Sequence, residues 1–420
     1  MKKVWTFLLF AGLLAFAGGF LLKSSDGKET VTERAEQTIN KSQLSRSRPQ
    51  KKENPQEEFV KKLLSDFSLQ FSLFKQSTLE NNRYVYKDRN ITVIFTVDPL
   101  FQKAVEKEFK RFRVKYGAYV AIDADTGKVL AAVSSTDYPD LTFKRTFPAA
   151  STFKIVTAAA ALETGLATPN TEMVCGGTGD SCSPSVWLNS RYKVKRRFAE
   201  SFATSANPFF GNLGRLLGKE TLLEFARKFG FNRKDYGFPW GILREPLDDY
   251  DIALTAAGLG ETRTSPFHQA LIASVIENEG IMVKPTLIEK VLTTDGRPLY
   301  TFRKELFGRV VSVGTARAIR EMMLLTVKQG TVSDKRHFRR LRRFYPRIVI
   351  GGKTGTLSEL TYPEGRCEWF TGFMEYNGRH IAFSSLAVNN HYFYITGYEI
   401  AAVASADFAK LYRNFAVRGR

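Results

Sequence analysis

The chain has 420 residues, 43% of them hydrophobic and 13% aromatic, which is enough to bury one large core or two unequal ones. Its 62 Lys and Arg exceed its 42 Asp and Glu, and the formal charge of +20 favours an anionic neighbourhood such as a membrane surface, a cell-wall polymer or a nucleic acid. The sequence has no zinc-finger spacing and no aromatic RNA-binding signature, and its four histidines are scattered, so we expect neither nucleic-acid binding nor a metal or other cofactor.

The N-terminal segment predicts a membrane anchor. Met1-Lys2-Lys3 precedes an uncharged apolar run over residues 4–22, about the length that spans a bilayer. Lysines before the run favour a single-pass anchor over residues 1–22 in the cytoplasmic membrane, with the rest of the chain on the periplasmic or other extracytoplasmic side. Ala15-Phe16-Ala17 also fits a signal-peptide cleavage site, but the apolar run continues beyond it, which favours a retained anchor.

Two segments are expected between this anchor and the main domain. Residues 23–58 are rich in Ser, Gln, Lys, Arg and Glu and nearly free of aromatics, which predicts a flexible, solvated tether. Residues 59–96 are expected to form a small β-rich linker region. Within it, residues 67–73 alternate between apolar and polar with period two, and the apolar residues 91–97 follow a candidate turn.

The main domain is predicted over residues 97–420, and Asp98-Pro99 provides an N-cap and a first-turn proline for its first helix. Apolar runs predict five strands, over residues 118–122, 129–133, 347–352, 369–376 and 380–389. The stretch from 151 to about 320 has mainly helical patterns, and residues 398–418 predict a closing amphipathic helix. We therefore expect an α+β fold in which both ends of the domain build one antiparallel sheet around an inserted helical block.

A serine and a lysine stand at the start of an alanine-rich helical pattern that Gly165 ends. Ser151 and Lys154 are three residues apart, so their side chains are neighbours on a helix and the amine can reach the hydroxyl. An amine in an apolar site has a lowered pKa and can take the serine proton. Alone this pair is weak evidence, because a helix cap and an exposed helix lysine would give the same pattern.

Two later motifs strengthen the first. Ser205-Ala206-Asn207 lies between helical segments, and Lys353-Thr354-Gly355-Thr356 follows an apolar strand. Ser-x-x-Lys, Ser-x-Asn and Lys-Thr-Gly in this order resemble the signature of penicillin-binding proteins and β-lactamases. The flanks at residues 147–154, 258–266 and 369–373 are similar too, so the resemblance covers the chain from about residue 91 onward. A phosphate-binding loop at Gly352-Lys353-Thr354 would need a glycine where Arg347 stands.

The resemblance implies an acyl transfer through a serine. Ser151 would be the acylated nucleophile and Lys154 its base, while Ser205, helped by Lys353, would relay a proton to the leaving amine. The backbone N–H groups of Ser151 and Thr356 would form the oxyanion hole, in which one donor is typically worth roughly 3 kcal/mol of transition-state stabilisation.

The remaining motif residues would hold the substrate. By the same resemblance, Asn207 would bind a substrate amide, and Lys353, Thr354 and Thr356 would bind the terminal carboxylate of a D-alanyl-D-alanine stem peptide. Gly355 would leave room for the substrate to pair along its strand.

Three features depart from the family pattern or stand outside it. Ala149-Ala150 replaces the usual glycine before the nucleophile. Residues 335–343 form an unusually dense basic run, which is typical of a solvated loop or helix face and for which we also consider contact with anionic lipid or wall polymer. Cys175 and Cys182 flank a glycine-rich stretch and could close a disulfide loop outside the cytoplasm, which would leave Cys367 as a thiol.

The resemblance favours a membrane-anchored peptidoglycan D,D-transpeptidase that β-lactams acylate. A D,D-carboxypeptidase uses the same residues with water as acceptor, and a catalytically idle envelope scaffold is the alternative from a different class. A β-lactamase is less favoured, because the Glu-x-x-Leu-Asn deacylation motif is not evident. The stretch before residue 91 is too short for a glycosyltransferase domain, so a separate glycosyltransferase partner is implied.

Overall fold

The computed structural model describes residues 54–414, except residues 136, 137, 139, 145, 362 and 391–394. The predicted anchor over residues 1–22, and the predicted tether as far as residue 53, lie outside this part of the chain. The described residues from 54 to 414 belong to one compact unit. Among the described residues, no helix combines the length and the apolar character that crossing a bilayer requires.

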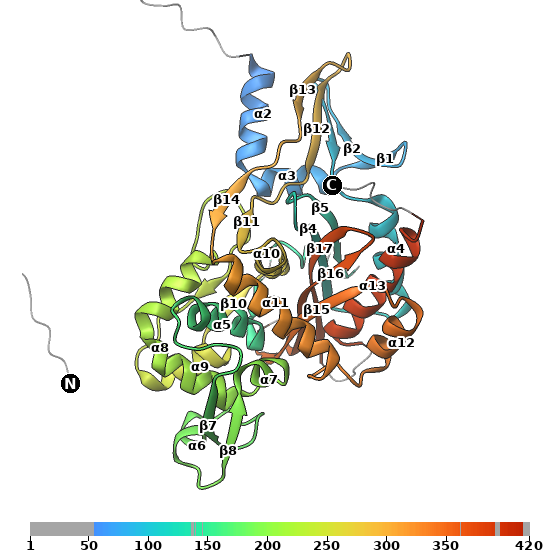
Figure 1. Cartoon of the computed structure of the whole chain (residues 1–420). Coiled ribbons are helices and arrows are strands. Elements are labelled where there is room, and N and C mark those ends of the chain that lie inside the picture. Colours follow the sequence, from blue (N-terminus) through green and yellow to red (C-terminus); the bar gives the residue numbers. More distant parts are fainter. Residues whose placement is uncertain are drawn as a thin grey trace, which may run out of the picture. The chain divides into compact units, whose positions relative to one another are not determined.

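The main sheet has five antiparallel strands in the order β15-β16-β17-β4-β5 (Figure 1). Its strands are β4 (Gly117–Asp123), β5 (Val129–Ser134), β15 (Val349–Glu359), β16 (Gly365–Tyr376) and β17 (Arg379–Asn389). Strand β17, near the end of the chain, pairs directly with β4, near the start of the domain. The predicted α+β fold, with one antiparallel sheet built from both ends of the domain, is therefore confirmed.

Helices cover both faces of this sheet. One group is α4 (Pro99–Arg111), α12 (Arg336–Phe344) and α13 (Gly397–Leu411), and the other is α5 (Lys154–Glu163), α8 (Asn207–Lys228), α10 (Pro266–Glu277) and α11 (Val313–Lys328). Phe101 of α4, Phe338 of α12 and Phe408 of α13 belong to one buried cluster with strand residues. As predicted, Asp98 caps α4, because its carboxylate accepts hydrogen bonds from the two backbone N–H groups at positions 100 and 101.

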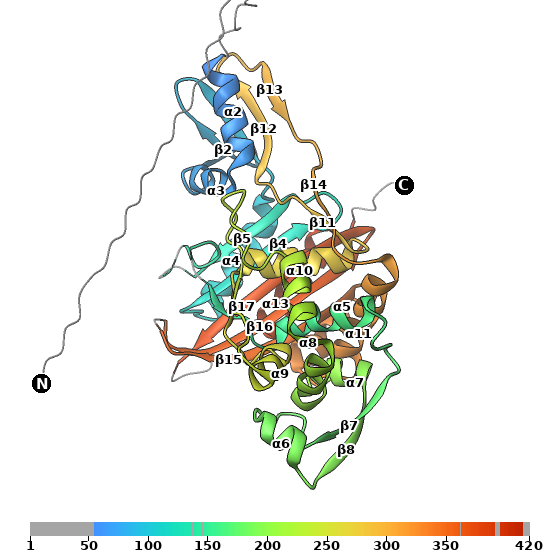
Figure 2. The same ribbon diagram turned by 90° about the vertical axis from the view of Figure 1, so that its left-hand side faces the viewer.

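Smaller elements complete the helical side. They are α6 (Pro184–Asn189), α7 (Phe198–Ala203), α9 (Asp249–Ala257), β6 (Phe147–Pro148), β7 (Glu172–Gly176), β8 (Lys193–Arg197), β9 (Ile242–Leu243), β10 (Thr262–Thr264), β11 (Ile281–Val283) and β14 (Leu306–Arg309). Figure 2 shows α6, β7 and β8 together at the bottom of the molecule. This hairpin and its helix continue directly into α7, which leads to the second motif.

A second five-stranded sheet, in the order β1-β2-β3-β12-β13, lies beside two N-terminal helices (Figure 1). The two helices are α2 (Pro55–Ser65) and α3 (Phe67–Lys75). The strands are β1 (Thr78–Glu80), β2 (Arg83–Lys87), β3 (Ile91–Phe95), β12 (Ile288–Thr293) and β13 (Pro298–Thr301). The region predicted over residues 59–96 thus includes two helices and shares its sheet with a hairpin from the middle of the chain. The last residues of the predicted tether, from Pro55 onward, are also helical because they belong to α2.

The strand prediction for residues 67–73 was wrong, because this segment lies in helix α3. Asp66 caps the helix by accepting hydrogen bonds from the backbone N–H groups of Ser68 and Leu69. Phe67, Phe71 and Phe74 then fall on one buried helical face with spacings of four and three residues. Phenylalanines at positions 67 and 71 satisfy both a period of two and a helical period, so the short window was ambiguous.

Candidate active site

Ser151 and Lys154 meet at the start of α5. Ser151 lies in a short 3₁₀ helix, η1 (Ala150–Phe153), which continues into α5 at Lys154. Side chains three residues apart eclipse in a 3₁₀ turn, and this brings Lys154 Nζ to 2.6 Å from Ser151 Oγ. The Lys154 side chain is fully buried, whereas Ser151 is half-buried and opens toward solvent.

The second motif lies opposite this pair. Ser205 follows α7 with φ = +62°, a left-handed conformation that is unfavourable for a residue with a side chain. Asn207 begins α8, and its Oδ1 accepts a hydrogen bond of 2.7 Å from Lys154 Nζ. Lys154 Nζ is 3.3 Å from Ser205 Oγ. The predicted residues of the first two motifs therefore surround one amine.

The third motif supplies a second amine from strand β15. Lys353 is fully buried, and its Nζ donates to Ser205 Oγ at 2.8 Å and to the Thr354 backbone oxygen at 3.0 Å. Ser205 Oγ thus lies between two lysines that are far apart in sequence. Thr354 is half-buried and Thr356 is exposed on the same strand. All three motifs predicted from the sequence converge at one site.

Gly355 packs against the turn that carries the nucleophile candidate. A Cβ at Gly355 would lie 2.9 Å from Thr152 Cγ2 and 3.2 Å from the Ala149 backbone oxygen. The glycine therefore allows β15 to approach η1 closely, which is a different reason from the substrate clearance that the sequence suggested. This contact holds the backbones of Ser151 and Thr356, the two predicted oxyanion-hole donors, on adjoining segments.

Burial sets the electrostatics of both lysines. Burial, and then the positive charge of Lys353, hold the pKa of Lys154 well below its ordinary value, while Cys182 acts weakly in the opposite direction. Burial lowers the pKa of Lys353 to about 7. Aromatic rings contribute to these apolar surroundings, because Phe210 lies 5.5 Å from Lys154 Nζ and Phe202 lies 5.9 Å from Lys353 Nζ.

The contacts of Lys154 are compatible with a neutral amine. A neutral amine has two N–H donors and one lone pair, and Lys154 Nζ has three oxygen neighbours. Asn207 Oδ1 can only accept, and Ser205 Oγ can accept the second N–H group. The lone pair is then available for the hydroxyl proton of Ser151, so the arrangement can deprotonate that hydroxyl.

A loop over residues 177–183 lies against the second motif and was not recognised from the sequence. The Gly179 backbone oxygen accepts a hydrogen bond of 2.8 Å from the Asn207 backbone N–H. Asn207 Nδ2 lies 3.4 Å from the Asp180 backbone oxygen and 3.8 Å from Cys182 Sγ. The glycine-rich composition indicated a loop, but nothing in the sequence indicated its neighbour.

The three cysteines are free, with Cys175 and Cys367 buried and Cys182 exposed. The disulfide considered between Cys175 and Cys182 is therefore not formed in this structure. Cys175 lies in strand β7, where burial raises the pKa of its thiol.

Another contact that the sequence did not reveal supports the third motif. Thr331 Oγ1 lies 2.9 Å from Thr354 Oγ1, and the Thr331 backbone N–H donates to the Ala203 backbone oxygen at 3.1 Å. Thr331, three residues beyond the end of α11, thereby joins β15 to the end of α7. Such long-range contacts leave no local signal in the sequence.

One group of potential metal ligands exists among the described residues, away from these motifs: Glu277, Glu375 and His380. Arg320 already pairs with both carboxylates, at 2.9 Å each, and His380 Nδ1 lies 2.7 Å from Glu277. The group is therefore an ion-pair network that joins α10 and α11 to β16 and β17.

Comparisons with known proteins agree with this geometry. Residues 117–410 match the family described as penicillin binding protein transpeptidase domain. The chain is 25% identical over 309 residues to "Peptidoglycan D,D-transpeptidase PbpA" of Mycolicibacterium smegmatis, covering 61% of this chain and 58% of that protein. It is 26% identical to "Stage V sporulation protein D" of Bacillus subtilis, covering 67% of this chain and 46% of that protein. The chain thus spans less than two thirds of either relative.

The fold is also similar to solved structures. A penicillin G acyl-enzyme complex of penicillin-binding protein A from M. tuberculosis superposes with a TM-score of 0.63 at 24% identity, covering 76% of this chain and 80% of that one. An ampicillin complex of penicillin binding protein 3 from the same organism gives a TM-score of 0.65 at 18% identity, covering 82% of each chain. With a family match over residues 117–410 and all three motifs at one site, the chain belongs to the penicillin-binding protein transpeptidase domain family.

Proposed function

We propose that this protein is a peptidoglycan D,D-transpeptidase that cross-links stem peptides through a serine acyl-enzyme. The observation that carries the proposal is the distance of 2.6 Å between Lys154 Nζ and Ser151 Oγ, combined with a pKa of Lys154 well below its ordinary value. A buried neutral amine at hydrogen-bond distance activates a serine nucleophile. The relatives named as D,D-transpeptidases support the choice of reaction.

In the first half-reaction, Lys154 takes the hydroxyl proton while Ser151 Oγ bonds to the penultimate D-alanine carbonyl carbon. The carbonyl oxygen becomes an oxyanion, which the N–H groups of Ser151 and Thr356 stabilise. When the intermediate collapses, the peptide C–N bond breaks and the leaving amine needs a proton. Ser205 provides it and recovers a proton from Lys154, because its Oγ lies 3.3 Å from Lys154 Nζ.

In the second half-reaction, an amine from a neighbouring stem attacks the acyl-enzyme. The amine loses one proton through the same relay, its nitrogen bonds to the acyl carbon, and Ser151 Oγ leaves with a proton from Lys154. Before the first half-reaction, Lys353 and the hydroxyls of Thr354 and Thr356 bind the donor's terminal carboxylate, which then leaves with the released D-alanine. Asn207 Nδ2 binds a substrate amide, in place of its long 3.4 Å contact with the Asp180 backbone oxygen.

The location and layout of the protein form part of the proposal. Residues 1–22 anchor the chain in the cytoplasmic membrane, residues 23–58 act as a tether, and the domain from residue 97 acts on the extracytoplasmic side after a linker region over 59–96. A separate glycosyltransferase supplies the glycan strands. Removal of residues 1–22 should make membrane association sensitive to salt, and association that persists after a salt wash would contradict the anchor.

The test is acylation of the full chain by a fluorescent penicillin, followed by intact mass over hours. We expect a long-lived adduct on the wild type and none on Ser151→Ala. Rapid turnover of the adduct would point to a β-lactamase instead, and no adduct would point to an idle scaffold.

A second assay separates the transpeptidase from a carboxypeptidase. The full chain receives a stem pentapeptide that ends in D-Ala-D-Ala, with and without an added amine acceptor. A transpeptidase forms the amide-linked product when the acceptor is present. Release of D-alanine with hydrolysed donor as the sole product, at every acceptor concentration, would assign the carboxypeptidase reaction.

A further inference from the structure

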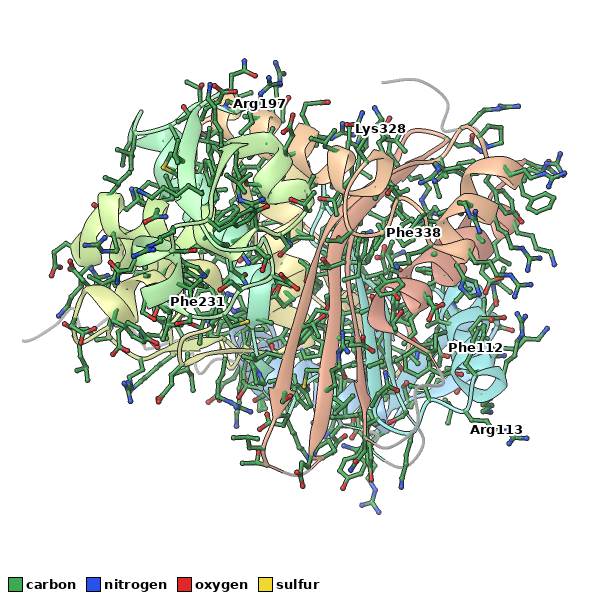
Figure 3. The ribbon with its side chains drawn as sticks, turned by 90° about the horizontal axis from the view of Figure 1, so that it is seen from below. Phe112, Arg113, Arg197, Phe231, Lys328 and Phe338 are labelled. Carbon is green, nitrogen blue, oxygen red and sulfur yellow. The ribbon has the colours of Figure 1, made fainter. Side chains whose placement is uncertain are left out.

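Helix α12 presents a row of arginines to solvent on the sheet face opposite α5 and α8. Its sequence, RHFRRLRRF, places Phe338 and Leu341 in the buried cluster beneath the helix. Figure 3 shows Phe338 between α12 and the strands, with nitrogen-tipped side chains extending outward on this side of the molecule. The exposed arginines of this segment define the α12 basic face: Arg336, Arg339, Arg340, Arg343 and Arg347.

These arginines have no carboxylate partner among the described residues, whereas the neighbouring Arg342 has a structural role. The Arg342 guanidinium donates to the backbone oxygens of Val327 and Ser333 at 2.8 and 2.7 Å. Arg336, Arg339, Arg340 and Arg343 repeat at three- and four-residue spacing, where like charges repel and destabilise a helix. The burial of Phe338 and Leu341 offsets that repulsion, so the face remains available for an external anion.

A hollow of about 660 Å³ adjoins the α12 basic face, between α4, α12 and α13. Apolar atoms of Leu341, Phe344, Ala402 and Val403 contribute to its lining, together with the cations Arg111, Arg340, Arg347 and Arg413. Two carboxylates also line it, of which Glu108 pairs with Arg111 at 3.1 Å and Asp407 has a pKa raised to about 6 by burial. The lining therefore combines a cationic majority with apolar surface.

We propose that the α12 basic face is a second membrane-contact surface that binds the phosphates of anionic phospholipid headgroups. Guanidinium groups pair with phosphate through two parallel hydrogen bonds. Phe344, which is 61% exposed at the end of the helix, reaches the boundary between headgroups and acyl chains. This exposed ring and the apolar part of the hollow favour a lipid over a phosphate polymer, which offers no acyl chain to bury.

The length of chain before the compact unit permits this contact. Residues 23–53 span at most about 100 Å when fully extended, so the predicted anchor does not decide which face of the domain meets the bilayer. The proposal stands independently of the acyl-transfer chemistry, because none of the arginines contacts the three motifs. Binding and acylation can therefore be measured separately on each variant.

The test measures the binding of residues 54–420, the compact unit, to vesicles by co-sedimentation. We expect binding to equimolar phosphatidylglycerol and phosphatidylcholine, weak binding to phosphatidylcholine alone, and loss of binding at high salt. Each cation at an anionic surface typically contributes roughly fivefold, so Arg339→Gln/Arg340→Gln/Arg343→Gln should weaken partitioning by roughly 100-fold. Penicillin acylation of this variant should equal that of the wild type, which verifies its fold.

The matched control removes three exposed cations elsewhere, in Arg89→Gln/Arg303→Gln/Lys304→Gln. This control should bind vesicles like the wild type, and an equal loss would overturn the proposal because total charge alone would then govern binding. Phe344→Ala should weaken vesicle binding without changing the binding of soluble polyglycerol phosphate. Tighter binding of that polymer than of the vesicles, or wild-type vesicle binding by Phe344→Ala, would overturn the lipid assignment.

Discussion

Acylation by a penicillin should fall as the pH rises above the pKa of Lys353. Burial lowers this pKa to about 7, so the ammonium form that binds the penicillin carboxylate declines in the free enzyme at mildly alkaline pH. Lys154 acts in its neutral form, which persists as the pH rises, because its pKa lies well below the ordinary value. The decline of the acylation rate at alkaline pH therefore reports the deprotonation of Lys353, because the base Lys154 stays neutral over this range. The second-order acylation rate constant should fall about tenfold between about pH 8 and about pH 9.

The assay is stopped-flow or gel-based acylation at limiting penicillin concentration, because the second-order constant reports the free enzyme. Lys353→Arg is the matched variant, since a guanidinium stays charged over the whole range. Its absolute rate will be lower, but its profile should stay flat where the wild type declines. A wild-type profile that remains level or rises across this range, or an equal decline in Lys353→Arg, would refute the assignment of the limb to Lys353.

Three further outcomes follow from the site geometry. Lys154→Met should reduce acylation about 10³-fold with the fold retained, as intact mass and circular dichroism would show, and an unchanged rate would eliminate Lys154 as the base. Lys353→Met should raise the free energy of unfolding, and the gain should be largest at acidic pH. The pKa of Lys353 is depressed in the folded protein, so below about pH 7 the folded state bears the full cost of a buried charge. This cost disappears as the pH rises toward the ordinary lysine pKa of the unfolded chain. Denaturant melts of this variant and the wild type at several pH values would check this, and a gain that grew with pH would contradict it. Gly258→Ala should cost about 3 kcal/mol of unfolding free energy and slow acylation, because the new Cβ would lie 2.1 Å from the Ala150 backbone oxygen. Gly165 also has a positive φ but has open space around it, so Gly165→Ala should cost about 1 kcal/mol. Equal costs in chemical denaturation would show that backbone strain alone accounts for both.

The main sheet could be predicted because its strands are long, apolar and bounded by turns. Strand β17 begins one residue before the predicted range over 380–389, whereas β16 ends with the predicted range over 369–376 but begins four residues earlier. The second sheet was missed in the middle of the chain, although Asp295-Gly296 between β12 and β13 is a strong hairpin signal. Gly296 indeed has φ = +85°. The surrounding helical patterns led us to assign the whole stretch to the helical block.

The site could be identified from the order of its three motifs in the sequence. Among its interatomic distances, only the one between Ser151 and Lys154 follows from their spacing in the sequence. That Ser205 Oγ would lie 2.8 Å from Lys353 Nζ, across 148 residues of sequence, depends on the tertiary packing of α11 against both α7 and β15. The positive φ of Ser205 likewise depends on tertiary packing, since nothing about a serine favours that conformation. The roles of the motif residues came from the family resemblance and stay predictions until the variants are measured.

Burial lowers the pKa of both lysines of this site, and the charge of Lys353 lowers that of Lys154 further, without an acidic partner within the three motifs. A nearby carboxylate would raise a lysine pKa and keep the amine protonated, whereas here burial is the first cause of lowering for both residues. Tuning by burial costs stability, because the unfolded chain can protonate both amines in water. Both lysine side chains are fully buried, and β15 approaches η1 closely at Gly355 while a loop bonds to the Asn207 backbone. The burial that costs stability therefore also maintains the neutral amine that the proposed chemistry requires.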